Sequence, residues 1–289
     1  MRQSRRCRAS ASLPAMSQFA ALLLLYLLMV ACNAAAVIKY DKAATDGYAL
    51  SYVQPDGRTF GVWGIIYFLN FLLVVRANEL YPATAQAVGL GYCLNGLWLL
   101  ANGAAVVSGL SYWLAVWILV LYAGCLVWAY TSFEVDYMER PFNEKIMLFA
   151  PISANLSWVL LAALLNITNT LMDDRLDFTK HENRTRIGGP DWAIGVLGFA
   201  CLLGIVVSVT RSDIVFPTIT VWALLGVSRQ QTAGSGFPHP MAATLKDFAD
   251  QASIGLFAIA ILSVCLRWLA WHLEARERPE LKGAYMSVP

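Results

Sequence analysis

Indole and amide side chains recur at helical spacing in three apolar stretches of this sequence. Spacings of three, four and seven residues place such side chains on one face of a helix. The three faces consist of Phe60, Trp63, Tyr67 and Asn70; of Gly91, Asn95, Trp98 and Asn102; and of Asn155, Trp158, Ala162, Asn166 and Asn169. Indole rings give flat apolar walls, and amides give a few hydrogen bonds. Together they suit a cavity for a large, planar and mostly apolar ligand.

The same residues also have a simpler interpretation, as packing groups. Asparagines in membrane helices hydrogen-bond to neighbouring helices, each bond contributing on the order of 1 kcal/mol, and small residues let helices approach closely. Tryptophans are common at membrane interfaces in any case. Any single residue fits this interpretation, but three faces of the same chemistry favour a shared cavity.

Residues for covalent chemistry or metal binding are not grouped in this sequence. The three histidines lie far apart, and five cysteines stand alone in apolar stretches without a C-x-x-C motif. We find no nucleophile beside a base and no paired acids. Asp213, close to Arg211, fits the N-cap of a helix better than a proton relay. The sequence therefore predicts no catalytic residue, no metal and no cofactor, and we do not expect an enzyme.

The composition indicates that these faces belong to membrane helices. Of 289 residues, 58% are hydrophobic and 14% are charged, against about 25% charged in soluble domains. The net charge of +2 is small and the basic residues are scattered, which argues against a nucleic-acid partner. The expected partners are the lipid bilayer and a hydrophobic small molecule. A homodimer is left open, and the sequence does not identify the membrane.

Eight apolar runs approach or exceed the length of about 20 residues that a helix needs to cross the hydrocarbon core. Backbone groups must be paired within lipid, and no alternating pattern suggests a barrel, so each run is predicted to be a helix. The predicted fold class is all-α, a polytopic integral membrane bundle of about eight transmembrane helices. The runs are 17–38, 59–76, 84–106, 111–131, 146–170, 191–210, 213–229 and 251–273.

The first run follows a basic segment and therefore also resembles a signal peptide. Its apolar stretch continues through Ala36, Val37 and Ile38, which makes it long enough to span, so we expect it to be retained. Eight crossings place both termini on one side of the membrane. The arginines before the first run favour the cytoplasm as that side.

Several segments resemble the translocator protein and tryptophan-rich sensory protein family. Residues 55–67, PDGRTFGVWGIIY, are similar to the signature of that family's second helix. NGLW at 95–98 and PISANLSWVLLAALLN at 151–166 are similar to motifs of its third and fifth helices. WALLGV at 222–227 resembles a late-helix motif of the family's longer members.

This resemblance implies a five-helix translocator-like bundle over 17–170 and three additional transmembrane helices over 191–273. A basic extension at 1–16, a polar loop at 171–190 and a polar tail at 274–289 complete the predicted organisation. The family is known for binding porphyrins, sterols and aromatic ligands within its bundle. By this resemblance the candidate ligand contacts are Trp63, Tyr67, Asn95, Trp98, Trp158 and Asn166.

The sequence departs from the family pattern at two places. A lone Pro55 stands where short members often have two prolines, and no sterol-type motif follows Asn169. We therefore expect a binder, sensor, receptor or carrier of a hydrophobic planar ligand, with sterol recognition the least supported property. The alternatives are a transporter that moves a small solute between the first five helices and the last three, and a structural membrane subunit without its own ligand.

Overall fold

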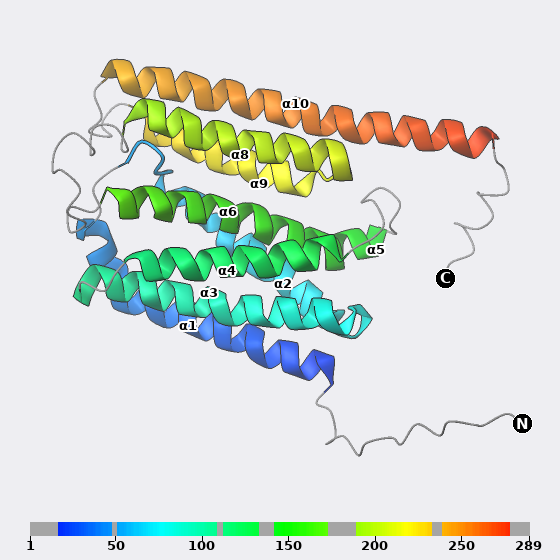
Figure 1. The fold of residues 1–289 in the computed structure, drawn as a ribbon, viewed down its shortest axis with the longest axis horizontal. Helices are drawn as coiled ribbons and strands as arrows, with labels where there is room; N and C mark the ends of the chain where they lie inside the picture. Colours follow the sequence, from blue (N-terminus) through cyan, green and yellow to red (C-terminus); the bar gives the residue numbers. More distant parts are fainter. Residues whose placement is uncertain are drawn as a thin grey trace, which may run out of the picture.

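Helices make up the regular structure of this protein. The computed structural model describes residues 17–47, 51–108, 112–132, 142–172, 189–232 and 239–277, and their regular elements are all helical (Figure 1). The long helices are α1 (Gln18–Gly47), α2 (Val62–Val75), α3 (Pro82–Ser108), α4 (Tyr112–Thr131), α6 (Ala150–Leu171), α8 (Pro190–Arg211), α9 (Val215–Gln230) and α10 (His239–Glu277). The short ones are η1 (Gly57–Gly61), η2 (Ala77–Glu79), α5 (Phe142–Glu144) and the π-helical turn η4 (Lys145–Phe149). The predicted all-α membrane bundle is confirmed.

Each predicted apolar run corresponds to one long helix, but the helix ends differ. Six helical segments of the described chain are long and apolar enough to cross a membrane. α3 and α9 are not among them, and α9 has only 16 residues, a length of about 24 Å. α10 begins at His239 rather than near residue 251, because hydropathy marks the apolar part of a helix and not its end.

α6 lies between the other helices of the bundle. It packs against α4 and α2 on one side and against α9 and α8 on the other (Figure 1). Over an apolar stretch of 18 residues within its membrane-spanning segment, 78% of the residues are buried, against 44% or less in the corresponding stretches of the other five. Around it, the side chains of α1, α2, α3 and α4 form one continuous hydrophobic core.

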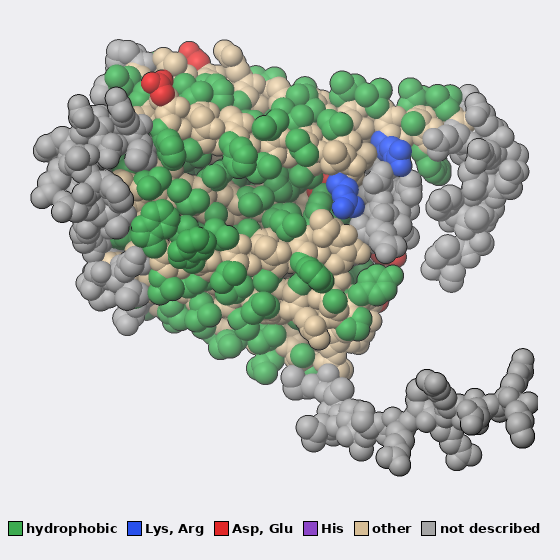
Figure 2. All heavy atoms as spheres, in the orientation of Figure 1, with side chains coloured by type: hydrophobic (Ala, Val, Ile, Leu, Met, Phe, Trp, Pro, Cys, Tyr) green, Lys and Arg blue, Asp and Glu red, His purple; other side chains and the backbone are tan. Residues whose placement is uncertain are grey.

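Close contact between α1 and α3 depends on a glycine. A Cβ added to Gly96 would lie 3.1 Å from the Cβ of Cys32, so only glycine allows this approach without movement. The outer surface is apolar, as Figure 2 shows for one face of the molecule. Trp117 and Trp128 on α4 are each 61% exposed, as expected of side chains that face lipid.

α8, α9 and α10 form a second hydrophobic cluster, which we call the C-terminal cluster. Its buried members from the helices are Ala193, Leu197, Leu224, Val227, Leu245 and Leu256. Tyr52 and Val53, which lie between α1 and α2 in the chain, are buried in the same cluster. A segment from the N-terminal half is therefore held by the three C-terminal helices. The predicted segments 1–16, most of 171–190 and most of 274–289 lie outside the described residues.

The first long helix begins and the last one ends at the same end of the bundle (Figure 1). We therefore predict that tags fused to the two termini behave alike when protease is added to sealed vesicles. Both tags should be removed from vesicles of one orientation, and both should survive in the other. Removal of only one tag would show that the number of crossings is odd.

Candidate functional site

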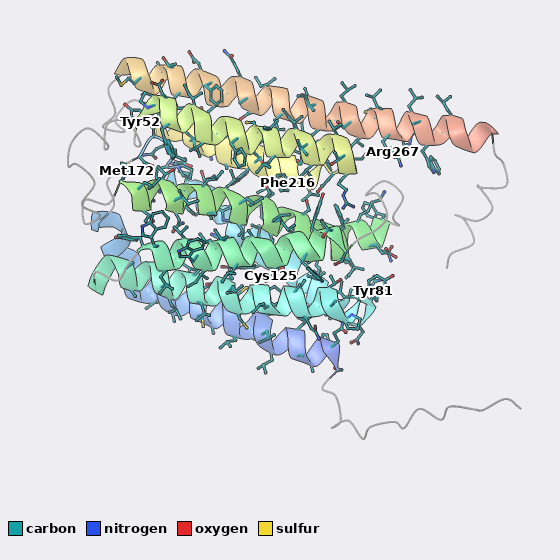
Figure 3. All side chains as sticks on the ribbon, viewed as in Figure 1. Tyr52, Tyr81, Cys125, Met172, Phe216 and Arg267 are labelled. Carbon is teal, nitrogen blue, oxygen red and sulfur yellow. The ribbon has the colours of Figure 1, made fainter. Side chains whose placement is uncertain are left out.

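A cavity of about 770 Å³ lies between α1, α2, α3 and α6, near the end of the bundle at which α6 ends. Tyr52 and Met172, labelled in Figure 3, mark that end. The segment from 51 to 61, which we call the α1–α2 loop, contributes Gln54 and Phe60 to the wall. The remaining lining residues are Val30, Asn33, Ala34, Ile38, Trp63, Tyr67, Trp98, Leu99, Asn102, Leu165, Asn166 and Asn169.

The structure brings the six predicted site residues into one region. Four of them line the large cavity directly: Trp63, Tyr67, Trp98 and Asn166. Trp158 lines a neighbouring cavity of about 60 Å³, which shares Phe60, Trp63 and Trp98 with the large one. Asn95 lines neither cavity, but it is fully buried and hydrogen-bonds to Asn33, a lining residue. Their role as ligand contacts stays a prediction.

Trp63 is the centre of an aromatic wall. Its ring centroid lies 5.4 Å from that of Tyr67, with an angle of 27° between the planes, and 5.9 Å from that of Trp98, at 34°. Trp158 approaches Trp63 edge-on at 6.1 Å and Phe60 edge-on at 5.9 Å. Such tilted and edge-on contacts are favourable for aromatic rings. The wall is therefore fixed by contacts among its own members.

Asn33 on α1 is a cavity residue that the sequence analysis did not identify. Its Nδ2 donates to the hydroxyl of Tyr67 at 2.5 Å and to Oδ1 of Asn95 at 2.7 Å. These bonds tie α1 to α2 and α3 at the floor of the cavity. The apolar run of α1 has no tryptophan and no second amide near Asn33, so the sequence shows no repeated pattern of such residues on this helix.

Other asparagines of the predicted stripes serve packing instead. Asn70 donates to the carbonyl of Ile66 and accepts from Tyr92, and Asn155 exchanges hydrogen bonds with Tyr122. These residues are buried and do not line the cavity. On the predicted faces of α2 and α6, the packing interpretation therefore holds at the end with Asn70 and Asn155. The cavity lies at the other end of these faces.

The α1–α2 loop is docked on the C-terminal half of α9. The backbone N–H of Asp56 donates to the carbonyl of Gly226 at 3.1 Å, and the indole N–H of Trp222 donates to the carbonyl of Thr59 at 2.8 Å. Arg229 pairs with the carboxylate of Asp56 at 3.3 Å and donates to Thr59 Oγ1 at 3.2 Å. The WALLGV segment therefore holds the loop that forms part of the cavity wall.

The ion pair is the weaker part of this contact. The side chain of Arg229 is 43% exposed and that of Asp56 is 17% exposed, and such pairs contribute at most about 1 kcal/mol. Partial burial alone would raise the pKa of Asp56, but hydrogen bonds from Thr59 and Arg229 outweigh it and lower that pKa. The pair therefore stabilises the docked loop above the ordinary pKa of 3.8 and is lost only as pH falls through the lower folded-state value.

Asp213 lies between α8 and α9, at the end of the bundle opposite the cavity. Its Oδ1 accepts from the backbone N–H groups of Val215 and Phe216 at 2.7 and 3.3 Å, as an N-cap residue does. Its Oδ2 accepts from the hydroxyls of Tyr130 and Ser153 at 2.9 and 2.5 Å. The N-cap position of α9 is Ile214, one residue after the expected one, but the Asp213 carboxylate accepts from the first turn of α9 and also links α4 and α6 to its start.

These features define a multi-pass membrane protein of helical type with a cavity inside its bundle. The model of the TSPO-like protein family matches residues 18–264, which is most of the chain. The chain belongs to the TSPO-like protein family. Because the match extends into α10, the family likeness includes the three C-terminal helices. Comparison with curated proteins found no match, and comparison with solved structures found none either.

Proposed function

We propose that the protein binds a hydrophobic planar molecule, of tetrapyrrole or sterol type, in the cavity between α1, α2, α3 and α6. The aromatic wall centred on Trp63 supports this proposal most directly, because it presents flat ring surfaces to the cavity. The volume of about 770 Å³ falls within the range of small-molecule sites, roughly 300–1,000 Å³. Flat walls suit a conjugated ring system better than a sterol, whose rings are puckered.

Binding without covalent chemistry is the activity that the lining chemistry supports. The described lining residues provide indoles, amides, one phenol and aliphatic groups, and none of them is an acid, a thiol or an imidazole. We therefore infer a sensor, binder or carrier rather than an enzyme. In each of these roles the ligand enters and leaves unchanged, so its occupancy can be measured directly.

The test is a titration with protoporphyrin IX dimethyl ester, a flat apolar ring, against the protein in lipid nanodiscs. A bound ring should quench tryptophan fluorescence saturably and shift its own absorption band. Trp63→Leu removes an aromatic contact with the ligand, and Trp158→Leu removes the edge-on contacts that hold Trp63 and Phe60. Such a contact is worth about 0.5–1.5 kcal/mol, so affinity should fall roughly two- to tenfold.

Trp117→Leu is the matched control, because Trp117 lies on α4 with 61% of its surface exposed and lines neither cavity. This variant should bind the ester as tightly as the unmodified protein. If all three variants bind equally, the aromatic wall is packing and the proposal fails. Quenching that never saturates would show partition into lipid rather than binding.

A further inference from the structure

The polar atoms of the cavity wall are uncharged. Six lining residues provide an amide or a phenol, namely Asn33, Gln54, Tyr67, Asn102, Asn166 and Asn169, and no described lining residue carries a charge. Asp56, two residues after the lining residue Gln54, is paired with Arg229. A ligand inside the cavity therefore finds hydrogen-bonding partners but no counter-ion among the described residues.

Two indole N–H donors at the cavities have no partner among the described residues. Nε1 of Trp98 and Nε1 of Trp158 are both buried without a hydrogen bond. Trp98 is 7% exposed and Trp158 is 3% exposed, so surface water does not reach them readily. Buried polar groups in native proteins are nearly always paired with protein, water or ligand. Each indole therefore has the capacity to donate to an acceptor on a bound molecule.

Two amide oxygens of the large cavity are likewise without a partner among the described residues. Oδ1 of Asn33 is free because its Nδ2 makes both of the bonds to Tyr67 and Asn95. Oδ1 of Asn169 is buried without a hydrogen bond as well. Asn33 and Asn169 line only the large cavity, whereas Trp98 lines both. Acceptors and donors thus stand at different parts of the same wall.

From these atoms, and resting on the proposed function, we propose that the cavity selects uncharged ligands that have both a hydrogen-bond acceptor and an N–H or O–H donor. A planar heterocycle with a ring N–H and a carbonyl or ester oxygen has this chemistry. An ionised carboxylate inside the cavity would lose its hydration without gaining a counter-ion, which is costly. A porphyrin diacid and its dimethyl ester share one ring system and differ in having two ionised carboxylates or two uncharged methyl esters.

The experiment compares protoporphyrin IX with its dimethyl ester at pH 8, in nanodiscs of uncharged lipid. The two probes partition differently into lipid, so their affinities are not compared directly. The decisive quantity is the ratio of each probe's affinity for Asn169→Lys to its affinity for the unmodified protein, because partition cancels in this ratio. The added cation should strengthen binding of the diacid by about tenfold and leave the ester unchanged or weaker. Leu114→Lys, at an exposed position on α4, is the control and should change neither ratio.

A second variant tests the indole donor. Trp98→Phe keeps an aromatic ring and removes the N–H, so it should weaken ester binding by about two- to tenfold. The same variant should bind perylene, a planar hydrocarbon without acceptors, as the unmodified protein does. An equal loss for both probes would show that Trp98 acts only through its ring, and would overturn its role as a donor.

The outcomes separate the two proposals. If neither porphyrin gives a saturable signal, the proposed function itself fails. If both bind and the diacid gains no affinity from Asn169→Lys, the selection for uncharged ligands is wrong and the binding function stands. A gain for the diacid without a gain for the ester supports both.

Discussion

Gly226→Ala should displace the α1–α2 loop from α9 and weaken ligand binding at least fivefold. A Cβ at this position would lie 2.1 Å from Oγ1 and 2.6 Å from Cγ2 of Thr59, distances that atoms do not tolerate. Overpacking of this kind costs about 1–3 kcal/mol. The loop includes Phe60 and Gln54 of the cavity wall, so we expect the cost to appear in ester affinity as well as in thermal stability.

The matched control for this prediction is Gly198→Ala on α8. A Cβ there would meet no atom within 4 Å, and replacing a helical glycine by alanine stabilises a helix by about 0.5–1 kcal/mol. Thr59→Gly removes all three atoms that would collide with Ala at position 226. Combining it with Gly226→Ala should therefore restore part of the lost affinity. If Gly226→Ala binds the ester normally, the docked loop does not affect the cavity.

The position of Gly226 also explains why this part of the site was not predicted. The sequence singled out WALLGV as a motif, but nothing local indicates that Trp222 and Gly226 hold a loop more than 160 residues earlier in the chain. Contacts of that separation depend on how whole helices pack, and periodicity describes only one helix at a time. The WALLGV segment could be recognised from the sequence, whereas the loop that it contacts could not.

The helices were predictable because the membrane imposes a single requirement, the pairing of every backbone group within a helix. Helix lengths were less predictable. The first turns of α10 contain Lys246 and Asp250, which precede the predicted apolar run at 251–273. In the structure Lys246 donates to Asp250 at 2.6 Å one turn away, and Asp250 also accepts from Ser228 on α9. These polar residues are satisfied within the helix pair, so the helix begins well before the apolar run.

The candidate site was predictable where several residues of one kind shared a helical face. Trp63, Tyr67 and Trp98 were found in this way, and they line one cavity. A stripe shows which residues share a face but not which part of the face is open, so Asn70 was indistinguishable from Asn166. Asn33 was missed for the opposite reason, since one amide in an apolar run forms no pattern. Distinguishing an asparagine that lines a cavity from one that packs between helices requires the positions of the neighbouring helices.

Asp213→Ala should lower stability strongly, although the residue lies at the end of the bundle opposite the cavity. Loss of the two hydrogen bonds from the first turn of α9 costs about 1 kcal/mol. The hydroxyls of Tyr130 and Ser153, both buried, would also lose this acceptor, and each lost hydrogen bond costs about 0.5–1.5 kcal/mol. We expect a total loss of about 3 kcal/mol, measured as a fall in melting temperature of roughly 5 °C or more in nanodiscs.

Asp213→Asn is the variant that separates these contributions, because its Oδ1 can still accept from the N–H groups of Val215 and Phe216. Its Nδ2 would replace the oxygen that faces Tyr130 and Ser153, whose hydroxyl oxygens can accept instead of donate. Its loss of stability should therefore stay below about 1 kcal/mol, close to that of Asp191→Ala, which removes an exposed acid from the first turn of α8.

Below its melting temperature, Asp213→Ala should bind the porphyrin ester normally. A fall in ester affinity at that temperature would show that the two ends of the bundle are coupled, and equal stability of the Ala and Asn variants would show that the capping and hydroxyl contacts contribute nothing.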